Sequence, residues 1–127
     1  MEELIAKARE VINNAYAPYS SFKVAAVVKT KSGKVYTGVN IENASYGLTV
    51  CAERVAVFKA VSEGDQDIDT VVVYTDTDEP TPPCGACRQV IAEFNPNALI
   101  VMAGRKKTVT AKLSELLPNA FTKERLR

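Results

Sequence analysis

The chain has 127 residues, of which 46% are hydrophobic and 24% are charged, values close to the average of globular proteins. This length and composition predict one folded domain over residues 1–127 and exclude a disordered chain, a collagen-like repeat and a fibre. Because 16 basic residues against 15 acidic ones leave a net charge of +1, we expect neither a polynucleotide nor an anionic membrane surface as a partner.

The first predicted elements are a helix and a β-hairpin. Apolar residues recur at helical spacing over residues 2–15, which predicts an amphipathic helix. Runs rich in β-branched residues at 23–30 and 34–39 predict two strands. The intervening Ser32-Gly33 is typical of a turn, so the two strands are expected to pair as a hairpin.

The rest of the chain alternates helices with strands. After a loop at 40–50, residues 51–63 predict a helix that is apolar on most sides, which indicates a buried, central position. Continuous apolar runs at 70–75 and 98–102 predict buried strands, and a helix that begins at Cys84 connects them. A short strand and a short helix are predicted last, at 107–110 and 113–117.

This order of elements predicts an α/β fold with three layers, α/β/α, and a mixed central sheet. Strands joined through a helix have right-handed crossovers and lie parallel, so we expect a largely parallel segment from residue 70 onward. The N-terminal hairpin adds an antiparallel edge to that sheet. Many small α/β domains share this pattern, so function has to be argued from particular side chains.

Three cysteines, Cys51, Cys84 and Cys87, stand at the starts of two predicted helices. An odd number of cysteines does not fit a closed disulfide framework. Neither a secretory signal nor an apolar run long enough to span a bilayer is visible. We therefore expect the protein in the reducing cytoplasm. Cys84 and Cys87 share one helix face, and a helix N-terminus favours thiolates. With no histidine in the sequence, three thiolates match the ligand count of a catalytic zinc that keeps one position open for water.

Glu53 decides between this open zinc site and its alternatives. A Cys-x-x-Cys pair also occurs in redox proteins and in structural zinc sites, and a lone cysteine is often a small core residue. Glu53 stands two residues after Cys51 in an apolar helix, where a carboxylate is costly unless it has a partner or a proton to move. Its plainer role would be a favourable charge on the helix dipole. A thioredoxin-like dithiol protein and a non-catalytic zinc-stabilised module stay open at this point.

The arrangement Cys51-Ala52-Glu53 with Pro83-Cys84-Gly85-Ala86-Cys87 matches the signature of zinc deaminases, with cysteine in place of the commoner histidine. Four blocks that together span nearly the whole chain resemble the small homotetrameric cytidine deaminases: YSSFKV at 19–24, GVNIENA at 38–44, CAER at 51–54 and LLPNAF at 116–121. A blasticidin-type or other nucleoside deaminase is the alternative within the same class.

The resemblance implies an activity and a cofactor. The activity is the zinc-dependent hydrolytic deamination of cytidine and 2′-deoxycytidine to uridine and 2′-deoxyuridine, with release of ammonia, in pyrimidine salvage. Zn²⁺ would be held by Cys51, Cys84 and Cys87, and Glu53 would act as the catalytic proton shuttle. Three thiolates on a divalent ion leave an excess of negative charge, which the neighbouring Arg54 is placed to offset.

The resemblance also implies how a nucleoside would be held. Phe22 would pack against the substrate, while Asn40 and Glu42 would form hydrogen bonds with the ribose. The main chain of Ala52 would contact the pyrimidine. Phe121 would cover the site of a neighbouring subunit, so the expected assembly is a cytoplasmic homotetramer with shared active sites.

Overall fold

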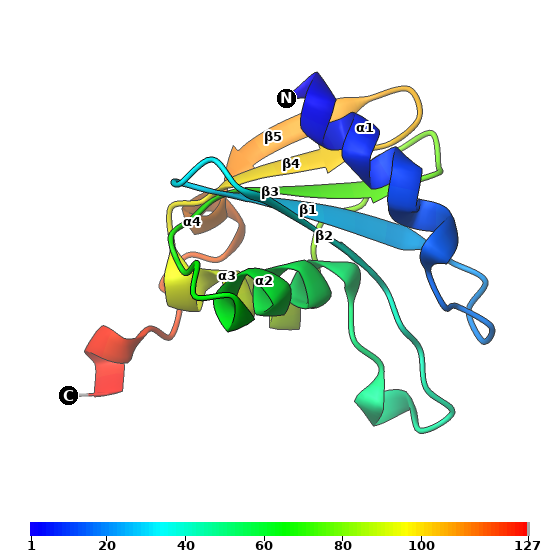
Figure 1. The fold of residues 1–127 in the computed structure, drawn as a ribbon. Coiled ribbons are helices and arrows are strands. Elements are labelled where there is room, and N and C mark those ends of the chain that lie inside the picture. Colours follow the sequence, from blue (N-terminus) through cyan, green and yellow to red (C-terminus); the bar gives the residue numbers. More distant parts are fainter. Residues whose placement is uncertain (127) are drawn as a thin grey trace.

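The computed structural model describes residues 1–126, which fold into a five-stranded sheet with helices on both faces (Figure 1). The strand order across the sheet is β2-β1-β3-β4-β5. The strands are β1 (Val24–Thr30), β2 (Val35–Val39), β3 (Ile68–Thr75), β4 (Leu99–Ala103) and β5 (Thr108–Lys112). The α-helices are α1 (Glu2–Val11), α2 (Ala52–Ser62), α3 (Gly85–Phe94) and α4 (Leu113–Leu116). Short 3-10 helices lie at Ile12–Asn14, Tyr46–Leu48 and Lys123–Leu126.

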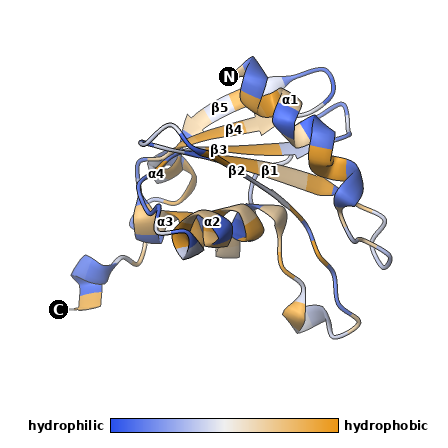
Figure 2. Ribbon diagram, viewed as in Figure 1, coloured by the Kyte–Doolittle hydropathy of each residue, from blue (hydrophilic) through white to orange (hydrophobic). Residues whose placement is uncertain are grey.

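The helices cover the two faces of the sheet with two separate apolar clusters. On one face, Ile5 and Ala8 of α1 pack with Val27 and Val72 from the central strands. On the other face, α2, α3 and α4 pack on the opposite side chains of the same strands. Figure 2 shows β1, β3 and β4 hydrophobic along most of their length between these helical layers. The predicted three-layer α/β/α architecture with a mixed sheet is therefore confirmed.

The parallel part of the sheet is smaller than the sequence pattern predicted. Strands β3 and β4, joined through α3, run parallel as expected. All other neighbouring pairs in the five-stranded sheet are antiparallel, including β4 with β5. Only residues 104–107 connect β4 to β5, which is too short for a crossover helix, so the chain reverses in a turn. The expectation of a largely parallel segment from residue 70 onward was wrong for this reason.

Helix α2 lies directly against the backbone of β2. A Cβ atom on Gly38 would lie 2.5 Å from the Ala52 carbonyl oxygen and 2.6 Å from the Ala56 nitrogen, so only glycine allows this approach. Ala56, Val57 and Ala60 of α2 are fully buried against the sheet. The prediction that this helix is central is confirmed, but its outer side is open, since Phe58 is 49% exposed.

Within residues 1–126, no helix has both the length and the hydropathy needed to cross a membrane.

Candidate functional site

The three cysteines meet where α2 and α3 begin. Cys51 is the N-cap of α2, Cys84 is the N-cap of α3, and Cys87 lies in the first turn of α3. The Sγ atoms of Cys51 and Cys84 are 3.9 Å apart, those of Cys84 and Cys87 are 3.3 Å apart, and all three lie within 4.8 Å of one another. A tetrahedral zinc with Zn–S bonds of about 2.3 Å places its sulfurs roughly 3.8 Å apart. The donor set therefore fits zinc in both chemistry and spacing.

The electrostatics of the cluster favour thiolate at one end of it. A hydrogen bond from the Cys87 thiol, with further hydrogen bonds from Arg54 and Cys84, lowers the pKa of Cys51 to about 5. The hydrogen bond that Cys87 makes with Cys51, together with burial, raises the pKa of Cys87. The N-termini of α2 and α3 add their dipoles to the same point. In the metal-free cluster, one thiolate is thus stabilised by its protonated neighbour, and metal binding displaces the remaining protons.

Among residues 1–126, Arg54 is the positively charged side chain that contacts the cysteine sulfurs. Its Nη2 atom lies 3.5 Å from Cys51 Sγ and 3.4 Å from the carbonyl oxygen of Thr49. Its Nε atom is buried and has no hydrogen-bond partner among the same residues. The guanidinium is therefore held against the cluster, and its hydrogen bond is one of the contacts that lower the pKa of Cys51.

Glu53 is a buried carboxylate in the first turn of α2, only 4% exposed. Burial raises its pKa above the ordinary value of 4.5, and the nearby Cys51 thiolate raises it further. A carboxyl group shifted in this direction holds a proton closer to neutral pH than an exposed glutamate does. The plainer role as a solvated charge on the helix dipole does not agree with this burial.

A cavity of about 250 Å³ opens beside Glu53 and the cysteines. The residues predicted from the sequence that line it are Phe22, Asn40, Glu42, Cys51, Ala52, Glu53 and Cys84. Several lining residues were missed by the sequence analysis: Ser20, Val24, Thr49, Val73, Thr81 and Pro82. Ser20 and Val24 belong to the block at 19–24 that resembles the family, but no role was predicted for them, and none of the quoted blocks contains the other four.

Asn40 fastens the segment that carries Phe22. Its Oδ1 atom accepts a hydrogen bond from the Val24 nitrogen at 2.9 Å, and its Nδ2 atom donates to the Phe22 carbonyl oxygen at 2.8 Å. Both polar atoms of the Asn40 side chain are therefore engaged with the backbone on either side of Lys23. This holding role was not predicted from the sequence.

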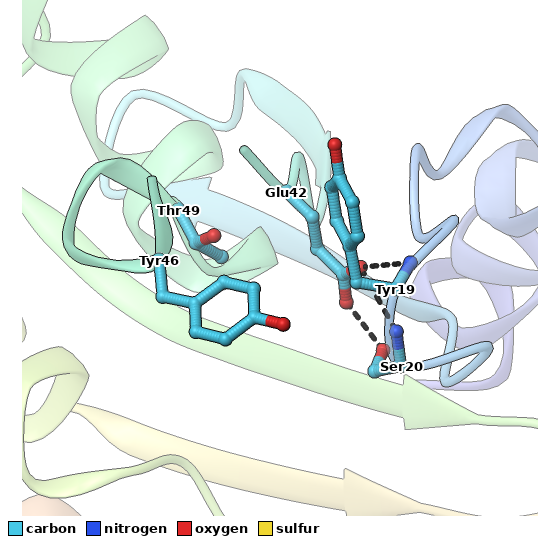
Figure 3. Close-up of a pocket in the computed structure, with 5 residues that line it drawn as sticks. All are labelled: Tyr19, Ser20, Glu42, Tyr46 and Thr49. Atoms are coloured by element: carbon cyan, nitrogen blue, oxygen red, sulfur yellow. Dashed lines mark hydrogen bonds between the residues drawn. The ribbon is translucent and has the colours of Figure 1, made fainter. Parts of the chain in front are cut away.

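Glu42 fastens the preceding turn in the same way (Figure 3). Its Oε1 atom accepts hydrogen bonds from the backbone nitrogens of Tyr19 and Ser20, at 3.0 and 3.1 Å, and its Oε2 atom accepts one from the Ser20 hydroxyl. The hydrogen bond from the Ser20 hydroxyl lowers the pKa of Glu42, so the carboxylate is ionised at neutral pH. Tyr46, which is 76% exposed, meets the ring of Tyr19 edge-on with 6.1 Å between centroids.

Phe121 lies apart from these residues. In the described part of the chain it is not among the residues that line the cavity, and its side chain is 60% exposed. Figure 1 shows the C-terminal end extending beyond α3, away from the sheet. The remaining predicted residues, from Phe22 to Cys87, are brought to one place by the ends of β1, β2, α2 and α3.

Comparison with known proteins places this geometry in a family. The family model described as the cytidine and deoxycytidylate deaminase zinc-binding region matches residues 1–103. A cytidine deaminase of Halalkalibacterium halodurans is 52% identical over 95% of this chain and 93% of its own length. A blasticidin-S deaminase of Bacillus cereus is 33% identical over 95% of this chain and 91% of its own length.

Solved structures give the same result. The crystal structure of a cytidine deaminase from Burkholderia pseudomallei superposes with a TM-score of 0.90 at 43% identity, covering 94% of this chain and 98% of that one. A cytidine deaminase from Mycobacterium tuberculosis superposes with a TM-score of 0.83 at 36% identity, covering 94% of this chain and 95% of that one. With the cysteine cluster able to hold the ion, these matches confirm the prediction of zinc. The chain belongs to the cytidine and deoxycytidylate deaminase family of zinc-binding proteins.

Proposed function

We propose that this chain hydrolyses cytidine and 2′-deoxycytidine to uridine and 2′-deoxyuridine, with release of ammonia, as a step of pyrimidine salvage. The observation that carries the proposal is a buried carboxylate beside a three-sulfur cluster, with Glu53, Cys51 and Cys84 on the wall of one cavity. Relatives named as cytidine deaminases that match nearly the whole chain support the same substrate.

Glu53 is the group that moves protons in this proposal. Zinc, when bound by Cys51, Cys84 and Cys87, supplies a Lewis acid that lowers the pKa of water. Glu53 takes a proton from the water that attacks C4 and passes it to the pyrimidine N3. It then takes the second proton of the same water, whose oxygen is now bonded to C4, and delivers it to the departing amine, so that cytidine and water give uridine and ammonia. The raised pKa of Glu53 suits a group that must both accept and donate near neutral pH.

The other predicted residues hold the nucleoside. Phe22 presents its ring at the cavity wall and packs against the substrate, and the Ala52 main chain contacts the pyrimidine. At the ribose, the Glu42 carboxylate accepts hydrogen bonds and the Asn40 amide accepts or donates them, while both side chains hold the Phe22 loop. Arg54 balances the charge of the thiolates.

Particular contacts favour this proposal over its rivals. A dithiol redox protein would use Cys84 and Cys87 alone, whereas Cys51 shares their cluster. A zinc-stabilised binding module would have no use for Glu53, a carboxylate buried on a cavity wall. A blasticidin-type activity is favoured less because that relative is 33% identical, against 52% for a relative named as cytidine deaminase.

The test is Glu53→Gln, which keeps the shape of the side chain and removes its ability to carry a proton. The variant should retain its zinc and lose turnover of cytidine by a factor of about 10²–10⁴ or more, because Glu53 acts at more than one step. Glu10→Gln, an exposed change on the opposite face of the sheet, is the matched control. Zinc content and uridine formation are measured for both variants, with blasticidin S as a second substrate. Wild-type turnover in Glu53→Gln would refute the role of Glu53.

We also propose that residues 1–127 form a single domain of a cytoplasmic homotetramer with shared active sites. Both apolar clusters share one sheet, which supports a single domain. Ile41, Leu48 and Phe58 are exposed along one groove beside α2, which supports an interface there. The three thiols are free, and free cysteines that bind a metal are typical of a reducing compartment, which supports the cytoplasm.

A mixing experiment tests the shared site. A chain that ends before Phe121 is refolded together with the Glu53→Gln chain, so that one supplies Glu53 and the other Phe121. The mixture should recover turnover that neither variant has alone. Failure of mixed tetramers to recover any turnover, or a fully active monomer in ultracentrifugation, would overturn the proposal.

A further inference from the structure

Two side chains directly after Cys87 hold the C-terminal segment by its backbone. Arg88 Nη1 donates to the carbonyl oxygen of Leu116 at 2.8 Å, and Gln89 Nε2 donates to the carbonyl oxygen of Phe121 at 2.5 Å. Leu116 is the last residue of α4, whose final carbonyl groups have no partner within the helix itself. The helix that carries a metal ligand therefore also anchors the segment that carries Phe121.

Arg88 makes a second contact on the metal side. Its Nε atom donates to the carbonyl oxygen of Pro83 at 2.8 Å, and Pro83 is a buried residue immediately before the ligand Cys84. A hydrogen bond to that carbonyl fixes the rotation of the peptide that joins Pro83 to Cys84. The direction in which the Cys84 Sγ atom leaves the backbone depends on this peptide.

One guanidinium thus bridges two backbone carbonyls that lie far apart in the sequence. Its planar group of N–H donors can satisfy both at the same time, because Nε and Nη1 point in different, fixed directions. A lysine ammonium placed at the same position is a point donor on a flexible stem, and it would keep the charge without fixing both carbonyls. The contact is therefore specific to arginine.

We propose that Arg88 is a positioning residue that couples the metal ligands to the C-terminal segment. This inference rests on the proposed function for the use of Phe121 at a substrate site, but the coupling itself does not depend on the substrate. The metal cluster and residues 116–121 behave as one mechanical unit, in which ordering one part orders the other. Gln89 contributes to the C-terminal half of this unit alone, since its side-chain amide reaches Phe121.

Arg88→Lys tests the bridge, with Arg9→Lys as the matched control. Arg9 lies on α1, over the ring of Tyr74 on the far face of the sheet. Zinc affinity by chelator competition should fall by about tenfold in Arg88→Lys, the lower end of what loss of a group that orients a metal ligand causes. The absorption bands of the cobalt-substituted protein, which report the geometry of the thiolate ligands, should change as well. Wild-type zinc affinity and cobalt spectrum in Arg88→Lys would overturn the proposal.

Gln89→Met separates the two halves of the unit. This variant keeps the length of the side chain but has no donor for the Phe121 carbonyl. Zinc affinity should fall by less than in Arg88→Lys, and the cobalt spectrum should stay unchanged because the Arg88 contact with Pro83 is kept, while cleavage of the C-terminal segment by a protease becomes faster and KM for cytidine rises with kcat little changed. Slower or unchanged cleavage in Gln89→Met would contradict the assigned contact.

The wild-type protein supplies a measurement that needs no variant. The backbone amides of Leu117 and of residues 119–121 should exchange hydrogen more slowly in the zinc-loaded protein than after removal of zinc by a chelator, at a concentration where the assembly is unchanged. Equal exchange in both forms would overturn the coupling. Because metal affinity, spectra and exchange are read without cytidine, a failure of the proposed deaminase activity would leave these results interpretable.

Discussion

Gly38→Ala should damage both the stability and the metal site, although it adds one methyl group. The new Cβ would lie 2.5 Å from the Ala52 carbonyl oxygen and 3.1 Å from Ala56 Cα. Unstrained contacts between such atoms begin at roughly 3.5 Å, so β2 and α2 must separate by about 1 Å. Both neighbours are backbone atoms, which cannot rotate aside as a side chain would.

The free energy of unfolding should fall by about 1–3 kcal/mol, the usual cost of overpacking a close contact. An unstrained glycine-to-alanine change would instead stabilise the chain by roughly 0.4–1 kcal/mol. The sign of the change in the free energy of unfolding therefore shows whether α2 contacts the β2 backbone at Gly38. Because Ala52 lies between Cys51 and Glu53, the shift also moves both site residues. A misplacement of about 1 Å can cost roughly 10²-fold in turnover.

The assay compares denaturant unfolding and cytidine turnover of zinc-loaded Gly38→Ala with those of Gly47→Ala, at equal protein concentration. Among the described residues, no heavy atom lies within 4 Å of a Cβ built on Gly47, so that variant should keep its stability. An unchanged or raised free energy of unfolding in Gly38→Ala would refute the claim that α2 is seated on the β2 backbone.

Three further changes test the electrostatics. Cys87→Ser removes a thiolate ligand, so zinc content and turnover should be lost together in metal analysis and a uridine assay. Arg54→Gln should weaken turnover while the variant keeps part or all of its zinc, because the charge facing Cys51 is lost. The pKa of Asp65 lies below its ordinary value of 3.8, chiefly because the Thr30 hydroxyl donates a hydrogen bond to the carboxylate. The ionised carboxylate therefore stabilises the fold above pH 3.8. This contribution is lost as the pH falls through the lower pKa of the folded state. The difference in Tm between wild type and Asp65→Asn should therefore shrink in acid, and a difference independent of pH would contradict the assignment.

The sequence predicted the positions of the main elements well because hydrophobic periodicity reports burial directly. The run at 98–102 is buried on both faces of the sheet, and the structure has β4 at Leu99–Ala103. The β-branched runs on either side of Ser32-Gly33 likewise predicted the hairpin, in which Gly33 has a φ of 92° that suits glycine. A local sequence pattern predicts the structure correctly where the apolar residues of a segment are all buried inside the same fold.

Long-range contacts were beyond the reach of the sequence. Nothing local shows that Asn40 holds the backbone at Phe22 and Val24, or that Arg88 reaches Leu116 across 28 positions. The sequence predicted a helix buried on most sides, whereas Phe58 on the outer side of α2 is exposed. An apolar residue gives the same sequence pattern whether its own fold or another molecule covers it. The cysteine cluster was predictable because zinc chemistry limits ligand types and spacing so narrowly.

Cys51 and Cys84 are 33 positions apart in the sequence, and this separation gives the metal centre a mechanical consequence. An ion bonded to both sulfurs acts as a cross-link that closes a loop containing β3, the middle strand of the sheet. Closing a loop of this length removes conformations from the unfolded chain, which raises the free energy of unfolding. An ion that binds only the folded form raises it further, by an amount that grows with the concentration of free ion. The ion that serves the reaction thus also cross-links the starts of two helices, and the Tm of the protein should rise with the concentration of free zinc.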